Sequence, residues 1–272
     1  WLNASTQLVS NLEGLVKVTD TNPLLNGALW YAQNLHWKIL PTHGLQPDGR
    51  CTCGKPHSDP KDVGKHPAIS GWQNEATDDS ATIQGWWERN SNFNIGVFAR
   101  PSGFFVMDID PRNGGDDSFY KLEERLGGDI PNTLTQITGE YTIRGVKKRG
   151  RHLFFSAPEG YTYPKDLGPL GFPGIDIKHN GYVLLYPSRH ITGVQYDWDA
   201  EKAAWNTEMS APSEAMLEYF GRKGGGGGYR NPSGGASVRR EGGAGGIWDF
   251  VAALEDENGE KMDLDRFMDE GV

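Results

Sequence analysis

Two aspartates one residue apart, Asp108 and Asp110, lie at the end of an apolar run. Pro111 and two glycines follow, so the segment is predicted to be a buried strand that leads into a turn. Side chains two apart in a strand point to one face, so both carboxylates project together while Met107 and Ile109 pack on the other face. Adjacent carboxylates repel each other unless divalent cations separate them from a phosphate-bearing substrate, and oxygen ligands suit Mg²⁺ or Mn²⁺. A solvated turn after an edge strand is the simpler alternative.

A third carboxylate lies on a later strand, predicted at residues 175–178, where polar residues alternate with apolar ones. Asp176 and Lys178 therefore share one face of that strand. If this strand lies beside the strand of Asp108, then Asp176 supplies the third carboxylate that a two-metal site requires. A simple ion pair between Asp176 and Lys178 is the structural alternative.

A loop at about residues 44–67 has almost no apolar residues to fold it but is rich in metal-ligand types. Within sixteen residues it contains four candidate ligands: Cys51, Cys53, His57 and His66. A tetrahedral Zn²⁺ would supply the folding energy that a core supplies elsewhere. A disulfide across one intervening residue would be strained, so the other possibility is a pair of free thiols in a reducing compartment. Asp59 or Asp62 could replace a histidine, and a disordered loop is the structural alternative.

Five cations fall within eight residues between a strand predicted at 133–138 and one that begins at His152. They are Arg144, Lys147, Lys148, Arg149 and Arg151. This segment is predicted to be a turn, and clustered cations repel one another unless they meet phosphate. The turn is therefore a candidate contact for nucleic acid or a triphosphate, with a solvated loop as the alternative.

Local signals predict where two helices begin. Asn22 followed by Pro23 is typical of a helix start, and Asp79 followed by Ser80 is expected to cap a second helix. Residues 94–98 are predicted to form a strand after that second helix.

Composition divides the chain into a body and its flanks. The 272 residues carry a formal charge of −9, of which residues 247–272 contribute −7, so the remaining residues are close to neutral at −2. We expect an N-terminal arm or helix at 1–21, a domain at 22–221, a glycine-rich linker at 222–246 and an acidic helical tail at 247–272. No apolar run approaches the roughly 20 residues that a membrane helix needs, so no membrane association is expected.

Three motifs in order resemble the bifunctional primase-polymerase domain of the archaeo-eukaryotic primase superfamily. The motifs are DID at 108–110, RHLFF at 151–155 and GIDIK at 174–178. The runs GKHP at 64–67, DPRNGG at 110–115 and PSRH at 187–190 resemble versions in phage and plasmid replication proteins. The resemblance covers residues 22–200 and implies an α+β fold: a mixed, mostly antiparallel sheet that carries the acidic residues, flanking helices, and a zinc-binding loop near one end.

The resemblance also implies roles for individual residues. Asp108, Asp110 and Asp176 would hold catalytic Mg²⁺ or Mn²⁺, and His152 would contact the incoming nucleoside triphosphate. Further nucleotide contacts would come from Arg151, Lys178, Arg189 and His190. The Zn²⁺ in the loop would be structural.

The implied activity is template-directed nucleotidyl transfer: a DNA primase and DNA polymerase that makes and extends primers on single-stranded DNA from NTPs and dNTPs. Phage or plasmid replication in the cytoplasm is the expected setting, with a fused or associated C-terminal helicase. No Gly-x-x-x-x-Gly-Lys-Ser/Thr loop occurs in the sequence, so unwinding would belong to other sequence. A non-catalytic DNA-binding replication adaptor is the alternative from another class. A metal-dependent nucleotide-sugar transferase would leave Asp176, Lys178 and the basic segment unexplained.

Overall fold

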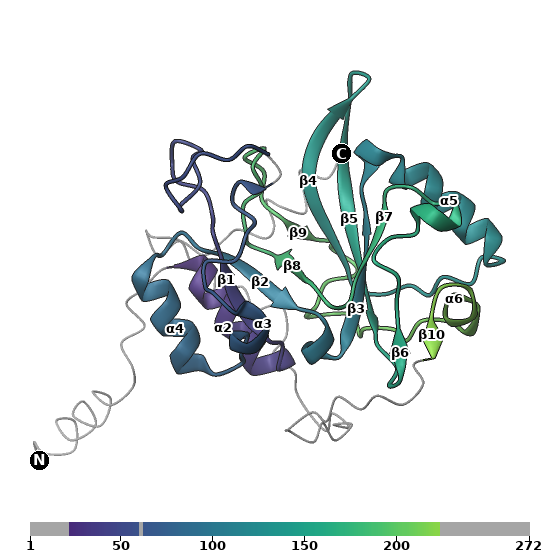
Figure 1. Ribbon diagram of the computed structural model, residues 1–272, viewed down its shortest axis with the longest axis horizontal. Coiled ribbons are helices and arrows are strands. Elements are labelled where there is room, and N and C mark those ends of the chain that lie inside the picture. The colour runs from purple at the N-terminus through teal and green to yellow at the C-terminus, as the bar shows by residue number, and fades with distance from the viewer. Residues whose placement is uncertain (1–21, 60–61, 224–272) are drawn as a thin grey trace, which may run out of the picture.

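A computed structural model describes residues 22–59 and 62–223 of the chain. The predicted N-terminal arm, all but two residues of the predicted linker and the acidic tail lie outside these residues. The described part has two halves, each built on its own antiparallel sheet (Figure 1). The predicted α+β class with antiparallel strands is confirmed, but the sequence predicted one main sheet where the structure has two.

The larger sheet has five strands in the order β7-β3-β5-β4-β9, and each pair of neighbours is antiparallel. Its strands are β7 (Ile175–Lys178), β3 (Phe104–Ile109), β5 (Val146–Ser156), β4 (Thr135–Ile143) and β9 (Asp197–Trp198). The second sheet has the order β1-β2-β8, with strands β1 (Ile39–Thr42), β2 (Asn94–Phe98) and β8 (Tyr182–Leu185). A short pair joins β6 (Tyr161–Thr162) to β10 (Arg222–Lys223).

Helices flank both halves of the structure (Figure 1). They are α2 (Pro23–Leu35), α3 (Trp72–Glu75), α4 (Ser80–Arg89), α5 (Gly115–Arg125) and α6 (Glu214–Tyr219), with 3-10 helices η2 (Arg100–Ser102), η3 (Pro111–Asn113) and η4 (Gly168–Leu170). The two predicted helix starts are confirmed: the Asn22 side chain accepts from backbone N–H groups at the start of α2, and Asp79 does the same for α4.

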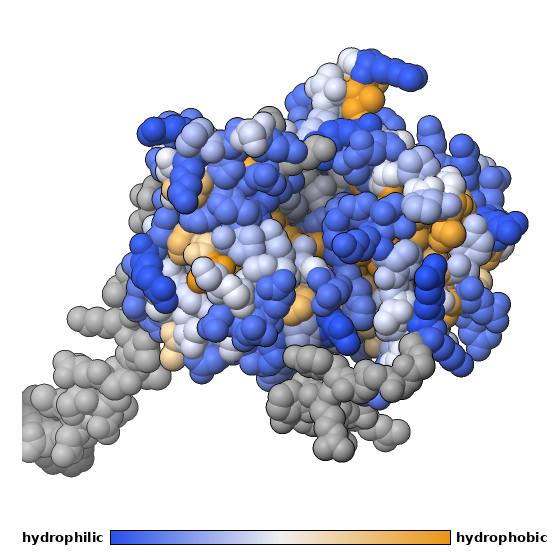
Figure 2. All heavy atoms as spheres, in the orientation of Figure 1, coloured by the Kyte–Doolittle hydropathy of each residue, from blue (hydrophilic) through white to orange (hydrophobic). Residues whose placement is uncertain are grey.

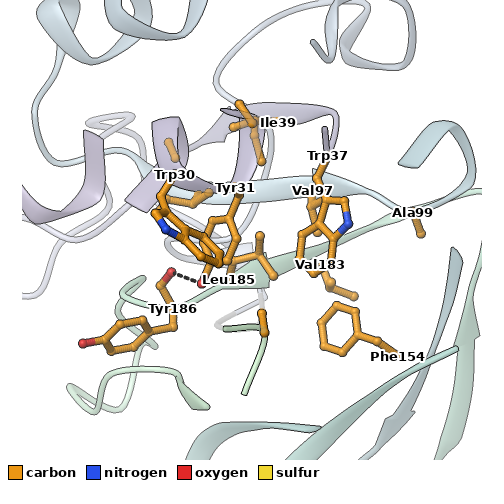
Figure 3. Close-up of a cluster of buried hydrophobic side chains, with 14 of the residues drawn as sticks. Trp30, Tyr31, Trp37, Ile39, Val97, Ala99, Phe154, Val183, Leu185 and Tyr186 are labelled. Carbon is orange, nitrogen blue, oxygen red and sulfur yellow. Dashed lines mark hydrogen bonds between the residues drawn. The ribbon is translucent and has the colours of Figure 1, made fainter. Parts of the chain in front are cut away.

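One hydrophobic core fills the space between the two sheets (Figure 3). Phe104, Val106 and Phe154 enter it from the five-stranded sheet, while α2 contributes Trp30 and Tyr31. The Tyr31 hydroxyl donates to the carbonyl of Tyr186 at 2.9 Å, so this buried polar group is satisfied. Each large apolar side chain buried here contributes about 1.5–3 kcal/mol, so this core holds the two sheets together.

A second core covers the opposite face of the five-stranded sheet. Phe105, Met107 and Ile109 of β3 pack there against residues of α5 and α6 that include Leu122 and Met216. The predicted packing of Met107 and Ile109 is therefore confirmed. Because β3 is buried on both faces, a carboxylate within it must have a function or a partner.

The surface is largely hydrophilic on the face shown in Figure 2. Among the described residues, no helix has the length and apolar character needed to span a bilayer.

Candidate active site and metal centre

The structure places two predicted acidic residues and the predicted histidine in one row across the five-stranded sheet. Asp108 on β3 pairs in register with Asp176 on β7 and with His152 on β5. Residues directly opposite in antiparallel strands have Cβ atoms about 4.5–5.5 Å apart, with side chains on the same face. The strand of Asp176 therefore lies beside the strand of Asp108, which was the condition for Asp176 to supply the third carboxylate.

Asp108 lies in an environment that disfavours its charge. Its side chain is 27% exposed and one oxygen lies 3.5 Å from His152 Nε2. Burial raises the pKa of Asp108 from 3.8 to about 6; the ammonium of Lys178 opposes this shift and the carboxylate of Asp176 adds to it. A buried carboxylate beside another is stabilised by a divalent cation, so this donor set fits Mg²⁺ or Mn²⁺.

Asp110 lies just beyond β3 and caps η3. Arg112 donates to it through Nε at 3.0 Å and through Nη2 at 2.7 Å, and Asn113 Nδ2 donates at 3.0 Å. Burial alone would raise the pKa of Asp110, but the hydrogen bonds from Arg112 outweigh it and hold the pKa below the ordinary value. Asp110 is thus ionised and oriented, and a cation bound here would share its oxygens with Arg112.

Asp176 also has a cationic partner, since Lys178 Nζ lies 2.6 Å from its Oδ2. The ion pair expected as the structural alternative therefore exists. It does not exclude a metal site. Lys178 and Arg112 each lie beside one of the carboxylates, and their positive charges offset the repulsion among these carboxylates. Within the described residues the three carboxylates do not form a preformed cluster of the kind found in the loop at 44–67.

A separate centre is preformed in that loop. The ligand atoms of four side chains lie within 4.8 Å of one another, and these are the predicted Cys51, Cys53, His57 and His66. Both cysteines are free thiols. Two sulfurs and two imidazoles are the ligand set of structural zinc sites, so the residues fit Zn²⁺.

The surroundings of the cluster also suit a metal. His66 Nδ1 lies 2.9 Å from the carbonyl of Asp62, which leaves Nε2 for a metal, and such an outer hydrogen bond fixes a ligand imidazole. Cys53 Sγ lies 3.1 Å from His57 Nε2. Burial raises the pKa of the Cys51 thiol, so a thiolate there requires a cation. Neither Asp59 nor Asp62 belongs to the cluster through its carboxylate.

The sequence matches the protein family described as bifunctional DNA primase/polymerase, N-terminal, over residues 28–215. The chain belongs to this family. The match covers most of the described residues and includes every predicted site residue. Membership confirms the resemblance seen in the motifs and implies nucleotidyl transfer in DNA replication. A search of curated proteins found no match to this chain.

Sequence reasoning did not assign a role to one cation of this primase-polymerase domain, Lys65. Its ammonium is partly buried, and its charge is attracted by Asp108 and Asp110 and repelled by Arg112 and Lys178. Burial is the main cause of its lowered pKa. No carboxylate of the described residues lies within 4.0 Å of this ammonium. The sequence signal that could have identified Lys65 was its place in the GKHP run at 64–67.

Backbone hydrogen bonds fix the segment that carries Lys65. Tyr182 Oη on β8 donates to the Lys65 carbonyl at 2.9 Å. The buried Asn94 side chain on β2 donates to the carbonyls of Gly64 and Arg189, both at 2.9 Å, and accepts from Arg189 N–H at 2.9 Å. The three-stranded sheet therefore presents Lys65 to carboxylates of the other sheet.

Two predicted nucleotide contacts lie elsewhere than expected. Arg151 pairs in register with Ile109, so it lies on the other face of the sheet from Asp108; its Nη2 is 3.6 Å from an Asp116 oxygen on α5. The structure does not bring Arg151 to the predicted catalytic carboxylates. Alternate residues of a strand face opposite ways, and the neighbouring His152 is the one that faces Asp108. His190 is 1% exposed, and its Nε2 lies 2.8 Å from the Tyr141 hydroxyl, so it supports Tyr141 from within the protein.

Arg189 is exposed, and its backbone is held by Asn94 as described above. Among the described residues no carboxylate lies within ion-pair distance of its guanidinium. It is thus available to a phosphate, as Lys65 is.

The basic segment is a strand, and its prediction as a turn was wrong. Residues 147–151 belong to β5, and the turn is confined to Arg144 and Gly145, which have φ of 50° and 80°. Four of the cations have acidic partners: Lys147 pairs with Glu140, Lys148 and Arg151 with Asp116, and Arg149 with Asp197. Repulsion among them is therefore balanced within the protein, without phosphate.

Proposed function

We propose that this chain performs template-directed nucleotidyl transfer, and that it both synthesises and extends primers on single-stranded DNA. The observation that supports this most is the register that aligns Asp176, Asp108 and His152 on adjacent strands. The family match supports the same class of reaction. NTPs and dNTPs would be the substrates, and a replicative helicase of a phage or plasmid system the partner.

The chain's own residues would position the reactants. Asp108, Asp110 and Asp176 would hold two divalent cations, and these would lower the pKa of the attacking 3′-hydroxyl and stabilise the pyrophosphate that leaves. His152 would donate to a phosphate oxygen, and Lys65 would contact the triphosphate. Phosphoryl transfer depends on such positioning and charge balance, so no side-chain nucleophile is needed.

The test is incorporation of labelled nucleotide on a single-stranded template, with and without an annealed primer, in Mg²⁺ or Mn²⁺. We expect products in both formats from the wild-type chain and a loss of at least about a hundredfold in the Asp108→Asn variant, since metal ligands contribute several kcal/mol to the transition state. Asp117, an exposed aspartate on α5, provides the matched control Asp117→Asn, which should retain full synthesis.

Other outcomes separate the alternatives. Synthesis only with a primer would limit the activity to polymerisation. Template binding without synthesis, unaffected by divalent cations, would favour the DNA-binding adaptor and contradict the proposal.

A further inference from the structure

The buried side chain of Gln136 connects the active-site histidine to the backbone of the other sheet. Gln136 on β4 has an exposed fraction of 0% and pairs in register with His152 on β5. Its Nε2 lies 3.1 Å from His152 Nδ1 and donates to the Leu184 carbonyl at 2.8 Å, while its Oε1 accepts from Tyr186 N–H at 2.9 Å. Every polar atom of this carboxamide thus has a partner.

The backbone partners determine the positions of the oxygen and the nitrogen in the Gln136 carboxamide. A backbone N–H can only donate and a carbonyl can only accept, so Tyr186 requires the oxygen and Leu184 requires the nitrogen. Gln136 Nε2 has two hydrogens; one goes to Leu184, and the other points at His152 Nδ1. His152 Nδ1 must therefore accept, which means that it carries no proton.

This arrangement determines what His152 offers to the active site. A charged imidazolium has a proton on both nitrogens, so an Nδ1 that accepts a hydrogen bond also means that the ring is neutral. A neutral imidazole with no proton at Nδ1 has its proton at Nε2. His152 Nε2 is the nitrogen that lies 3.5 Å from Asp108, so the N–H donor faces the acidic row.

We propose that Gln136 is a positioning residue that holds His152 in the Nε2–H tautomer, so that the imidazole donates a hydrogen bond to a phosphate oxygen of the incoming nucleotide. The opposite tautomer would direct a lone pair at that phosphate, and two acceptors repel. This inference rests on the proposed function for the identity of the ligand, but the tautomer itself is a property of the free protein.

The first experiment measures the tautomer without substrate. The chain has seven histidines, so protein labelled with ¹⁵N-histidine gives a small set of ring signals, and His152→Gln identifies the pair that belongs to His152. We expect proton coupling at Nε2 and an unprotonated Nδ1 at pH 7. An Nδ1–H tautomer, or a charged ring, in the wild-type protein would overturn the proposal.

The second experiment removes the carboxamide. Gln136→Met keeps the length of the side chain and loses both hydrogen-bond donors, so we expect His152 to exchange between tautomers and the KM for dATP with Mg²⁺ to rise about tenfold. Thr133→Val is the matched control: Thr133 is also buried and its hydroxyl donates to the carbonyl of Phe154, whereas His152 is not among its hydrogen-bond partners. This variant should lose stability but keep the tautomer and the KM.

The two measurements separate the inference from the proposed function. If Gln136→Met retains the Nε2–H tautomer, or changes it with no effect on the KM, the positioning role is wrong. If the wild-type chain makes no DNA but shows the expected tautomer, the proposed function fails while the assignment of the hydrogen bonds stands.

Discussion

At the scale of single residues, the buried carboxylate of Asp108 lowers the stability of the fold at neutral pH. Its pKa in the folded protein is about 6, above the ordinary value of 3.8, because burial penalises the charged form. The folded state therefore binds this proton more tightly than the unfolded state does. The stabilisation that comes from protonated Asp108 is fully present below pH 3.8 and is lost as the pH rises through about 6. At pH 7, without a divalent cation, the ionised side chain destabilises the fold.

The variant Asp108→Asn should consequently be more stable than the wild type at pH 7 while it makes no DNA. We expect a gain of about 2 kcal/mol, because each unit of pKa shift corresponds to about 1.4 kcal/mol and solvent weakens the effect of partial burial. The measurement is urea unfolding from pH 4 to pH 8 in buffer without Mg²⁺ or Mn²⁺. The gain should shrink toward pH 4; a gain that is constant across this range, or absent at pH 7, would contradict the assigned pKa. Asp117→Asn should show no such trend.

At the scale of elements, the loop at 44–67 depends on its cluster because it has little else to fold on. Replacing Cys51 and Cys53 with Ser removes two of the four candidate ligands, so we expect bound zinc to fall from about one per chain to none. The loop should then be cleaved by protease, while the two hydrophobic cores remain folded. The measurements are metal analysis by mass spectrometry and limited proteolysis.

A histidine beside the cluster gives the matched control. The His43 ring centroid lies 4.5 Å from that of His66, yet His43 is not part of the cluster. His43→Gln should therefore retain zinc and resist protease. Unchanged zinc in the double serine variant would refute the ligand assignment.

Local signals predicted most elements because the chemistry that starts or ends an element is local. Asn22 and Asp79 cap the helices that they were expected to cap, and the strands 94–98 and 175–178 have the predicted bounds. The four clustered ligands in the loop were also predicted, since a loop without apolar residues has no core of its own and a metal can replace that core. The two strands of the β4-β5 hairpin were predicted too short: the cations indicated a turn over 144–151, and their acidic partners at 116 and 197 are distant in sequence.

At the scale of the whole molecule, the candidate active site has residues from both sheets, which no local pattern shows. The carboxylates belong to the five-stranded sheet, whereas the segment with Lys65 is held by Tyr182 and Asn94 of the three-stranded sheet. Figure 1 shows the loop at 44–67 and the β4-β5 hairpin rising at the same end of the structure. Because Lys65 directly precedes the metal-ligand candidate His66, a metal bound by the cluster would also fix where this cation lies.

If Lys65 binds the triphosphate across the two halves, its loss should weaken substrate binding without unfolding either half. We expect Lys65→Met to raise the KM for dNTPs by about tenfold to a hundredfold, since hydrogen bonds to charged groups contribute about 1.5–3 kcal/mol. Lys65→Arg should restore part of the affinity, because the positive charge is kept. Lys55→Met, which removes an exposed lysine of the same loop, should leave the KM unchanged, and all three variants should retain zinc. A normal KM in Lys65→Met with zinc bound would mean that the three-stranded sheet only supports the site, whereas a raised KM with zinc bound would show that it supplies part of it.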